Sequence, residues 1–588
     1  MSLSWRGASV APTDEMPSPE AWEPVTVPGR PAQFAGADAV AYETVFDDPR
    51  SGAAEHAVLV LTGVYGQARV WCNGERVAGS DHYVTPLRVM LPDAEDHRVV
   101  VACRRPEHRF GGLHDTDRLP PERCVPGIWW GARIETYADP AVDRLWARPT
   151  LTEGGGAVDV RAEVVTSEPL DDRLTFSLRP AGAVRGGGMM DRVRVETDPG
   201  RTTVSTTIDV RDPSLWWPHD RGDQSRYVVR AKIGGTEHSL TTGLHSVTHD
   251  GTLRINGERV SARGVTLLDP TVADVERAVD ANANLVRIRA QGVSPAVAEA
   301  CDEHGVLLWA DLPLTGPGEF DVDRGRELAA SMASEIGHHP SLACVTVHDE
   351  PVDPYADGLG SGLLDRLRFR LRARRASYDD TTARTVADEI EGVPTFPVVG
   401  PPGIDPDAVT LYPGWQYGSV DDLAWLCDTY DVGGAVAGFG AGSAGSQATQ
   451  ARIVQALSGA LRRRESDIVV LDCLRDVPAG DMGVLTTEGA EKRAYRTLSD
   501  SYQPTQVFLA DPTPGESDIV VCHDRSSGAT VTVEWDHNGD RKQEERVIGA
   551  FGRVRVGSLT LDAGDELTLA AAVEGHAVKN EYRIDGSI

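Results

Sequence analysis

The sequence has little lysine, no long apolar run and no grouping of cysteines. Only four of its 588 residues are lysine, and acidic residues outnumber basic ones to give a net charge of −31. Such a chain offers nothing to neutralise a phosphate backbone, so no nucleic acid partner is expected. No run reaches the eighteen or so apolar residues that would cross a bilayer, and residues 1–6 do not begin an apolar leader. We therefore expect a cytoplasmic protein without a membrane partner.

The spacing of the cysteines indicates whether a metal is bound, and the scarcity of lysine indicates what kind of cytoplasm the protein suits. The eight cysteines stand singly, without metal-ligand spacing, so they are expected to be small buried residues, and neither a metal nor another cofactor is predicted. The excess of acid over lysine has two interpretations. A dense carboxylate surface suits the salt-rich cytoplasm of a halophile, where its self-repulsion is screened. Coding by GC-rich DNA would also replace lysine by arginine.

The apolar run Leu342–His348 ends abruptly at Asp349, Glu350 and Pro351. Its β-branched residues favour a buried parallel strand. Acids at the carboxyl end of such a strand lie at the mouth of an α/β barrel, where partial desolvation raises a carboxyl pKa toward neutral pH. Glu350 is therefore the first candidate for a general acid, with Asp349 beside it. The alternative is that both acids cap the following helix or pair with arginine.

A family resemblance is carried by the segment His339 to Pro351, HPSLACVTVHDEP. It resembles the acid/base strand of the family 2 glycoside hydrolases, whose pattern is roughly His-Pro-Ser, an apolar run and Asn-Glu-Pro. Glu350 matches the acid/base glutamate, whereas Asp349 stands at an asparagine that binds the sugar 2-hydroxyl and His348 at a small residue. Asn284 to Leu314 resembles the second and third barrel strands of mannosidase-like and glucosaminidase-like members. The resemblance implies a hydrolase of β-linked glycosides.

The resemblance and the changing rhythm of the sequence predict four domains. Residues 1–139 resemble the family's N-terminal jelly roll, a sugar-binding-like domain of a kind that often binds sugars but is expected to be scaffold here. Residues 140–244 resemble its immunoglobulin-like sandwich. Residues 245–502 alternate short strands with amphipathic helices and predict a (β/α)8 TIM barrel, and residues 503–588 predict a small C-terminal β-sandwich of unassigned role. The eight barrel strands are expected to end near Val265, Arg289, Asp311, His348, Asp388, Tyr412, Gly438 and Asp472.

The resemblance fails at the seventh barrel strand. In the family, a glutamate there, in a pattern like Glu-Phe-Gly-Ala, is the nucleophile, but the matching stretch Ala435 to Ser443 has Gly438 in its place. A retaining mechanism needs two carboxyl groups about 5–5.5 Å apart, and glycine has none. The missing side chain is expected to leave a small vacancy beside the anomeric carbon. The family's aromatic wall is kept, as Tyr412 and Trp415 in LYPGW.

Two arginines after the second strand are expected at the barrel mouth. Arg287 matches a family arginine, and Arg289 lies on the same strand face because side chains alternate. The two cations could hold the carboxylate of a uronic acid or a sulfate on a sugar. Alternatively, they could pair with the acids of the mouth, Asp311, Asp349 and Glu350.

Two functions remain open on these residues. The first is a family 2-like glycoside hydrolase of altered mechanism, with Glu350 as the acid and water activated by a group on the substrate or by an aspartate, either Asp311, Asp349 or Asp472. The second is a catalytically inactive carbohydrate-binding or scaffolding protein. The two differ in whether Glu350 faces another carboxylate across an open pocket or the mouth is filled by apolar side chains. The residues expected to bind substrate are Arg287, Arg289, Asp311, His348, Tyr412, Trp415, Gly438 and Asp472.

Overall fold

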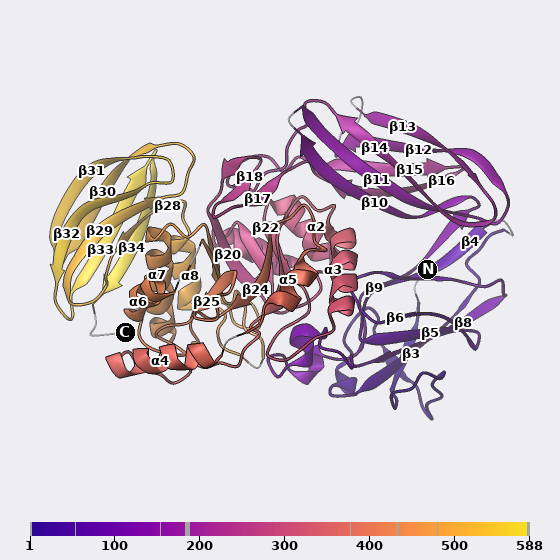
Figure 1. Ribbon diagram of the computed structural model, residues 1–588, viewed down its shortest axis with the longest axis horizontal. Helices are drawn as coiled ribbons and strands as arrows, with labels where there is room; N and C mark the ends of the chain where they lie inside the picture. The colour runs from indigo at the N-terminus through magenta and orange to yellow at the C-terminus, as the bar shows by residue number, and fades with distance from the viewer. Residues whose placement is uncertain are drawn as a thin grey trace.

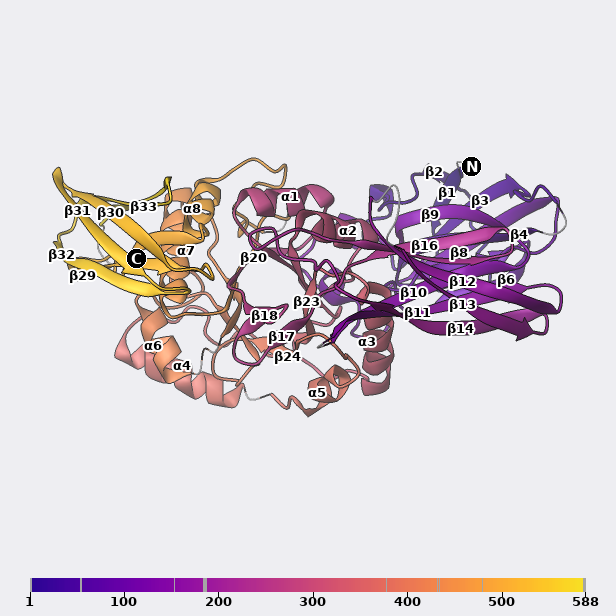
Figure 2. The same cartoon turned by 90° about the horizontal axis from the view of Figure 1, so that it is seen from above.

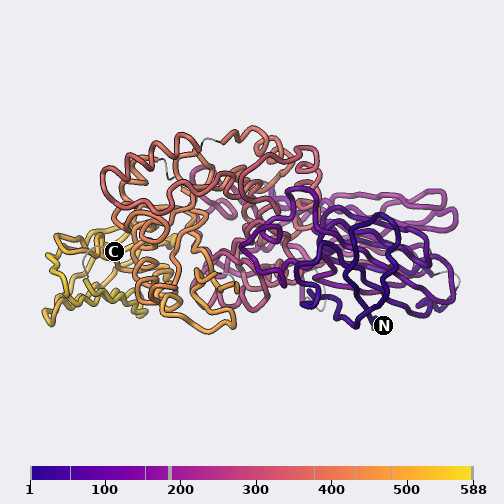
Figure 3. Tube along the Cα trace, turned by 90° about the horizontal axis from the view of Figure 1, so that it is seen from below, coloured from indigo at the N-terminus to yellow at the C-terminus, as the bar shows by residue number. Residues whose placement is uncertain are grey.

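The computed structural model describes residues 3–52, 55–152, 154–182, 188–376, 378–430, 432, 434–478 and 480–584. A central barrel carries two β-sandwiches on one side and a third on the other, so that the molecule is elongated (Figures 1 and 2). In the trace of Figure 3 the two chain ends accordingly lie toward opposite ends of the long axis.

The first sandwich has two antiparallel sheets, in the orders β2-β1-β3-β8-β5-β6 and β7-β4-β9. Inward-facing residues such as Leu59 and Leu61 alternate along β4 and fill one core, as the two-residue period of a strand dictates. Its strands are β1 (Trp5–Ser9), β2 (Glu23–Val25), β3 (Ala39–Asp47), β4 (Glu55–Tyr65), β5 (Gln67–Cys72), β6 (Glu75–Ser80), β7 (Leu87–Met90), β8 (Asp96–Arg104) and β9 (Gly127–Ala138). Three short 3-10 helices accompany them, η1 (Ala32–Phe34), η2 (Gly112–Asp115) and η3 (Pro121–Arg123).

The second sandwich pairs the sheets β10-β11-β14 and β13-β12-β15-β16 around its own core. Its strands are β10 (Ala141–Thr152), β11 (Gly155–Thr166), β12 (Leu170–Pro180), β13 (Met189–Thr197), β14 (Gly200–Val210), β15 (Tyr227–Ile233) and β16 (Thr236–Thr242). A small sheet, β17 (Val247–His249), β18 (Leu253–Ile255) and β19 (Glu258–Arg259), leads into the barrel. The indole of Trp216 is fully buried and donates to the Asp302 carbonyl at 2.9 Å, which fixes this sandwich to the barrel.

The barrel is a closed ring of eight parallel strands, as predicted. The strands read as nearly continuous apolar runs because both of their faces are buried. They are β20 (Ala262–Leu267), β21 (Leu285–Ile288), β22 (Leu307–Asp311), β23 (Leu342–Asp349), β24 (Thr395–Gly400), β25 (Ala408–Leu411), β26 (Ala435–Phe439) and β27 (Ile468–Leu471). The helices are α1 (Val272–Asp280), α2 (Pro295–His304), α3 (Val322–Ile336), α4 (Leu363–Arg375), α5 (Thr381–Ala387), α6 (Asp422–Thr429), α7 (Gln447–Arg463) and α8 (Arg493–Ser501).

The expected end of the fifth barrel strand was wrong. Asp388 is the residue that ends helix α5, and the strand is β24, seven residues further on. The apolar run of β24 is buried, although it contains Pro397, which lacks a backbone N–H and belongs to a residue type that is rare in central strands. The other seven expected ends lie within two residues of the observed ones.

The chain closes with a third sandwich, whose sheets are β28-β29-β32 and β31-β30-β33-β34. Its strands are β28 (Thr505–Leu509), β29 (Gly515–His523), β30 (Ala529–His537), β31 (Asp540–Ile548), β32 (Arg553–Leu561), β33 (Glu566–Val573) and β34 (His576–Arg583). None of the helices in the described residues is long and apolar enough to cross a membrane.

Candidate active site

The carboxyl ends of four barrel strands bring a network of acids and arginines to the barrel mouth. Arg287 and Arg289 come from the end of β21, Asp311 from β22, Asp349 from the end of β23, and Asp472 directly follows β27. All five side chains are 5% exposed or less. The structure therefore collects the predicted charged residues at one place, the end of a barrel where active sites lie.

Arg287 is bonded on every side by protein groups. Its Nε and Nη2 donate to the two oxygens of Asp311 at 3.2 and 2.5 Å, Nη2 also donates to Asp349 at 2.8 Å, and Nη1 donates to the Ala437 carbonyl at 3.0 Å. Four of the five N–H groups of Arg287 are thus bonded to protein groups, and the side chain is fully buried, so its main role is to hold the barrel strands together.

Arg289 contacts three carboxylates, one of which, Asp349, is also bonded to Arg287. Its Nε donates to Asp349 at 3.0 Å and Nη1 to Asp472 at 2.7 Å, and Nη2 lies 3.0 Å from Glu350. The two arginines thus share Asp349, as expected for side chains on one strand face. Of the two roles considered for these arginines, the structure shows pairing with the acids of the mouth.

Glu350 lies in an unusual backbone conformation and is held by two cations. Its φ of 45° is in the left-handed region, and its N–H donates to the Val399 carbonyl at 2.7 Å. The carboxylate is 17% exposed, and it accepts from Arg118 at 2.6 Å in addition to its contact with Arg289. A non-glycine residue held at positive φ is a strained feature that clusters at functional sites.

The charge state of Glu350 differs from the expectation. Burial acts to raise its pKa, as the sequence argument assumed, but Arg289 and Arg118 outweigh burial and hold the pKa below the usual glutamate value. The same balance, with Arg289 and Arg287 as the cations, holds the pKa of Asp349 far below the usual range. In this arrangement Glu350 is therefore an ionised carboxylate at neutral pH, and it carries no proton to donate.

Asp472 differs from the other aspartates of the mouth because one of its carboxylate oxygens has no hydrogen-bond partner in the described residues. Its Oδ2 accepts from Arg289 and from the Tyr412 hydroxyl, both at 2.7 Å. Its Oδ1 is buried and has no hydrogen-bond partner within the described part of the chain. Tyr412 itself is 5% exposed, and burial raises the pKa of its hydroxyl well above the usual value, so it stays a donor.

The expected vacancy at Gly438 is absent among the described residues, because Tyr412 fills it. A Cβ added to Gly438 would meet the Tyr412 hydroxyl at 2.7 Å and the Thr410 methyl at 3.4 Å. The glycine on β26 thus makes room for the tyrosine that binds Asp472. Sequence reasoning could not find this, since the two residues lie on different strands.

His348 and Trp415 occupy different environments. The His348 ring is buried between the Gly316 carbonyl at 2.8 Å and the Tyr378 hydroxyl at 2.7 Å, away from the acids, and burial lowers its pKa to about 4. Trp415 is 37% exposed, with its ring edge-on to Tyr412 at 5.8 Å. Trp415 is therefore the better placed of the two to meet a sugar ring, because aromatic faces bind the apolar faces of ligands.

A segment of the first sandwich, residues 109–124, lies across the barrel mouth. The Leu113 N–H donates to the Ala290 carbonyl at 3.0 Å, and Arg109 donates to the carbonyls of Thr315 and Gly316 at 2.7 and 2.8 Å. Arg118 of this segment reaches Glu350. No sequence pattern predicted this contact, and the expectation that the first sandwich is scaffold did not include it. The mouth is therefore closed by a charged network, which is neither of the two arrangements considered.

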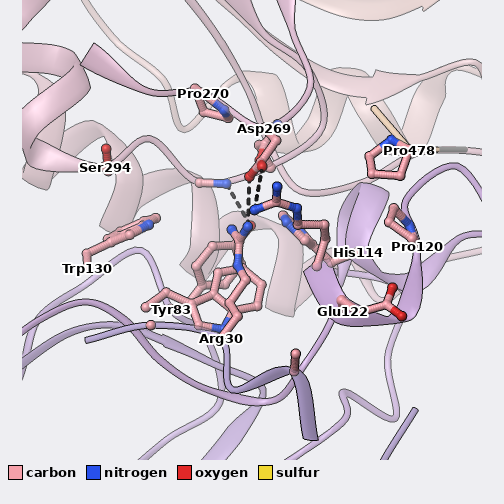
Figure 4. A pocket seen from close by; sticks show the side chains of 16 residues that line it. Arg30, Tyr83, His114, Pro120, Glu122, Trp130, Asp269, Pro270, Ser294 and Pro478 are labelled. Atoms are coloured by element: carbon pink, nitrogen blue, oxygen red, sulfur yellow. Dashed lines mark hydrogen bonds and ion pairs between the residues drawn. The ribbon is translucent and has the colours of Figure 1, made fainter. Parts of the chain in front are cut away.

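A cavity of about 770 Å³ lies beside this segment, between the first sandwich and the barrel (Figure 4). Arg30 and Arg123 meet there on Asp269, at 2.7 and 3.1 Å. His114 also lines the cavity, and burial lowers its pKa to about 3. Trp129 is covered by Tyr65, stacked at 4.2 Å, and by Arg30 at 4.1 Å, both residues of its own sandwich, so its ring is packed by protein groups. In the described residues, no three side chains of His, Cys, Asp or Glu gather to hold a metal ion.

An eight-stranded parallel barrel with β-sandwiches on both sides, and with acids and aromatic residues at its mouth, is the architecture of multidomain glycoside hydrolases. No family model matches the chain. Its sequence is similar to β-mannosidase B of Emericella nidulans, with 26% identity over 368 residues, which cover 51% of this chain and 42% of the relative. β-Mannosidase A of Aspergillus clavatus is 26% identical over 230 residues, 32% of this chain and 24% of the relative. The matches span less than half the length of these relatives.

Solved structures share the fold over nearly the whole chain. The β-D-mannosidase of Dictyoglomus thermophilum matches with a TM-score of 0.76 and 14% identity, covering 100% of this chain and 89% of that one. A β-glucuronidase of Bacteroides uniformis matches with a TM-score of 0.70 and 14% identity, covering 99% and 79%. The relatives and this shared fold support a family 2 glycoside hydrolase, the family that the sequence motifs resemble.

Proposed function

We propose that the chain hydrolyses a β-linked glycoside, with Glu350 and Asp472 as its pair of carboxylates. One observation carries the proposal: the two terminal nitrogens of Arg289 lie 3.0 Å from Glu350 and 2.7 Å from Asp472. Because both nitrogens belong to one planar guanidinium, the two carboxylates are neighbours. A pair of carboxyl groups is what glycosidases of either stereochemical class use.

Asp472 is the aspartate best suited to activate water. Asp311 and Asp349 are fully buried, and both oxygens of each are bonded to other protein groups. Asp472 is bonded through Oδ2 only, which leaves Oδ1 as an acceptor. A general base needs such an oxygen within reach of the water that it deprotonates.

Glu350 can act as an acid only when it is protonated, and displacement of Arg118 raises its pKa toward that state. Arg118 is 42% exposed, so a sugar that enters the mouth meets this side chain first. Once Arg118 has left, the burial that raises the pKa of Glu350 is opposed mainly by Arg289. Glu350 then takes up a proton from solvent. It gives this proton to the departing oxygen as the glycosidic bond breaks, while Asp472 takes a proton from the water whose oxygen bonds to the anomeric carbon, and the exposed Trp415 meets the sugar ring.

Carbohydrate binding without hydrolysis is the second candidate. It is favoured by the lowered pKa of Glu350 and by Gly438, whose strand carries no nucleophile. On this alternative the arginines of the mouth are permanent partners of the acids, and the sugar contacts only the exposed groups, Trp415 and Arg118.

The test is a screen of aryl β-glycosides in high salt, with mannosides, galactosides and glucosides beside glucuronides and sulfated sugars. The charged sugars are included because Arg118 is a partly exposed cation at the mouth. We expect turnover of at least one neutral or charged β-glycoside, and a loss on the order of 10²–10⁴ in Glu350→Gln for substrates with poor leaving groups. Asp472→Asn is expected to lose turnover for all substrates, because the base is removed.

Glu391→Gln is the matched control, since Glu391 is 76% exposed and outside the network. Its turnover should equal that of the wild type. If no substrate is hydrolysed but calorimetry detects sugar binding that Trp415→Ala abolishes, the binding function replaces the hydrolase. Turnover that survives Asp472→Asn unchanged removes Asp472 from the mechanism.

A further inference from the structure

Helix α4 exposes a row of four leucines, which we call the leucine row. Leu363, Leu364, Leu367 and Leu371 are 84%, 71%, 53% and 48% exposed. Single exposed apolar side chains are normal on a protein surface, but four on one helix of 13 residues form a contiguous patch.

The leucine row points away from the protein. With about 100° between successive residues of a helix, positions 363, 364, 367 and 371 fall within one side of α4. The opposite side carries Phe369 and Ala373, which are 3% and 2% exposed. Phe369 packs edge-on against Tyr355 and Tyr417, at 5.5 Å each, so the attachment of α4 to the barrel leaves the row free to meet a partner.

Arginines flank the leucine row on both sides. The helix carries one acid, Asp365, and an excess of cations in a chain of net charge −31. Of its six arginines, Arg366 bonds to Asp422 at 2.8 Å and Arg372 to the Tyr355 carbonyl at 3.1 Å, which leaves four exposed ones to meet lipid: Arg368, Arg370, Arg374 and Arg375. Figure 1 shows α4 at the lower edge of the molecule, below the C-terminal sandwich. A basic helix with an apolar side opposite its attachment has the composition of helices that lie in the interface of a bilayer.

We propose that α4 binds the surface of a membrane that contains anionic lipid. The leucine row enters the boundary between headgroups and acyl chains, and the arginines extend to the phosphates, as long basic side chains do. The negative charge of the rest of the chain opposes this contact only at short range, because salt screens it beyond about 8 Å at physiological ionic strength. No spanning segment is needed, so the expectation of no membrane partner, which rested on such segments, did not address this contact.

A second copy of the chain fits the helix less well. Two such helices packed row to row would bring two sets of arginines together, and like charges at close range are unfavourable. Other large apolar residues that are exposed in the described part of the chain include Val45 on β3, Met190 on β13 and Val547 on β31, so no other single helix or strand named here repeats the row. The inference concerns a different surface from the barrel mouth and does not rest on the proposed hydrolysis.

Vesicle sedimentation tests the proposal. The wild-type protein is mixed with vesicles of phosphatidylglycerol and phosphatidylcholine in equal parts, and separately with phosphatidylcholine alone, at a salt concentration that keeps the protein folded. We expect binding to the anionic vesicles and at least about tenfold less binding in the variant with all four leucines of the row changed to serine. Val547→Ser is the matched control, because this residue is 79% exposed on β31.

Two further measurements separate the contribution of the arginines to vesicle binding from that of the leucine row. Arg374→Gln with Arg375→Gln should weaken binding to anionic vesicles while leaving the circular dichroism spectrum unchanged, and hydrogen exchange in residues 363–375 should slow when vesicles are added. Equal binding to both vesicle types overturns the requirement for anionic lipid. Absence of wild-type binding, or binding that survives the fourfold leucine change, overturns the proposal. So does a dimer that depends on the leucines and forms in place of vesicle binding.

Discussion

Replacing Arg289 by methionine tests what holds the barrel mouth together. The Arg289 side chain is 5% exposed and lies 3.0, 3.0 and 2.7 Å from Asp349, Glu350 and Asp472. Methionine keeps the apolar stem but leaves three neighbouring carboxylates with one cation fewer. Removing one partner of a buried ion pair costs about 3–5 kcal/mol, because the remaining charge is uncompensated. We therefore expect the Arg289→Met variant to lose at least about 3 kcal/mol of unfolding free energy at pH 7.

The pH dependence of this loss has a definite sign. In the wild type, the pKa values of Asp349 and Glu350 lie below their usual values, so their contribution to stability is complete above about pH 4.3 and is lost as the pH falls further. Without Arg289, only Arg287 and Arg118 remain to oppose burial, so we expect burial to raise these pKa values above the usual ones and the stability of the variant to fall as the pH rises through them. The difference between wild type and variant should therefore be larger at pH 8 than at pH 5.

Urea unfolding followed by circular dichroism at pH 5 and pH 8 measures both effects. Arg148→Met is the control, because Arg148 and its partner Glu391 are 51% and 76% exposed and 3.4 Å apart. An exposed pair of this kind contributes less than about 1 kcal/mol. A loss in Arg289→Met no larger than in the control, or a loss that is the same at both pH values, would refute the reasoning about the network.

Three further outcomes are expected. Gly438→Ala should lose about 1–3 kcal/mol of stability, because its Cβ would lie 2.7 Å from the Tyr412 hydroxyl. Adding Tyr412→Phe to this variant removes the hydroxyl and should restore part of the loss, which urea unfolding of the single and double variants checks. The His348 ring, with a pKa of about 4, should show no titration between pH 5 and 8 by NMR, and its neutral state should make stability fall as the pH drops from 6.5 toward 4; a midpoint near 6.5 contradicts its burial. If the net charge of −31 reflects a halophilic source, dilution into low salt should unfold the protein, and a melting temperature indifferent to potassium chloride would oppose that interpretation.

The sequence was sufficient for the barrel and for the acids of its mouth. Buried parallel strands must be apolar on both faces, so an apolar run that stops at Asp349 and Glu350 marks a strand end by itself. Side-chain alternation likewise placed Arg287 and Arg289 on one face, and both reach Asp349. These are local properties of the chain, and local reasoning captured them.

The chemical state of the site depended on residues that are distant in sequence. The pKa of Glu350 is lowered by Arg289 and by Arg118, and Arg118 is 232 residues away in a different domain, so burial alone gave the wrong direction. The space at Gly438 is filled by Tyr412 from the neighbouring strand. Neither contact has a signature in spacing or composition, because both arise only when separate elements pack together.

The contact between Arg118 and Glu350 makes the proton affinity of the mouth depend on how two domains are placed. A Coulomb interaction weakens as its charges separate, so a small rigid-body shift of the first sandwich changes the charge favoured on a carboxylate in the barrel. Any force that reaches the sandwich is in this way converted into a change of protonation, without movement of a barrel strand. The isolated barrel would lack Arg118, so the pKa of Glu350 measured on it would differ from that in the whole chain.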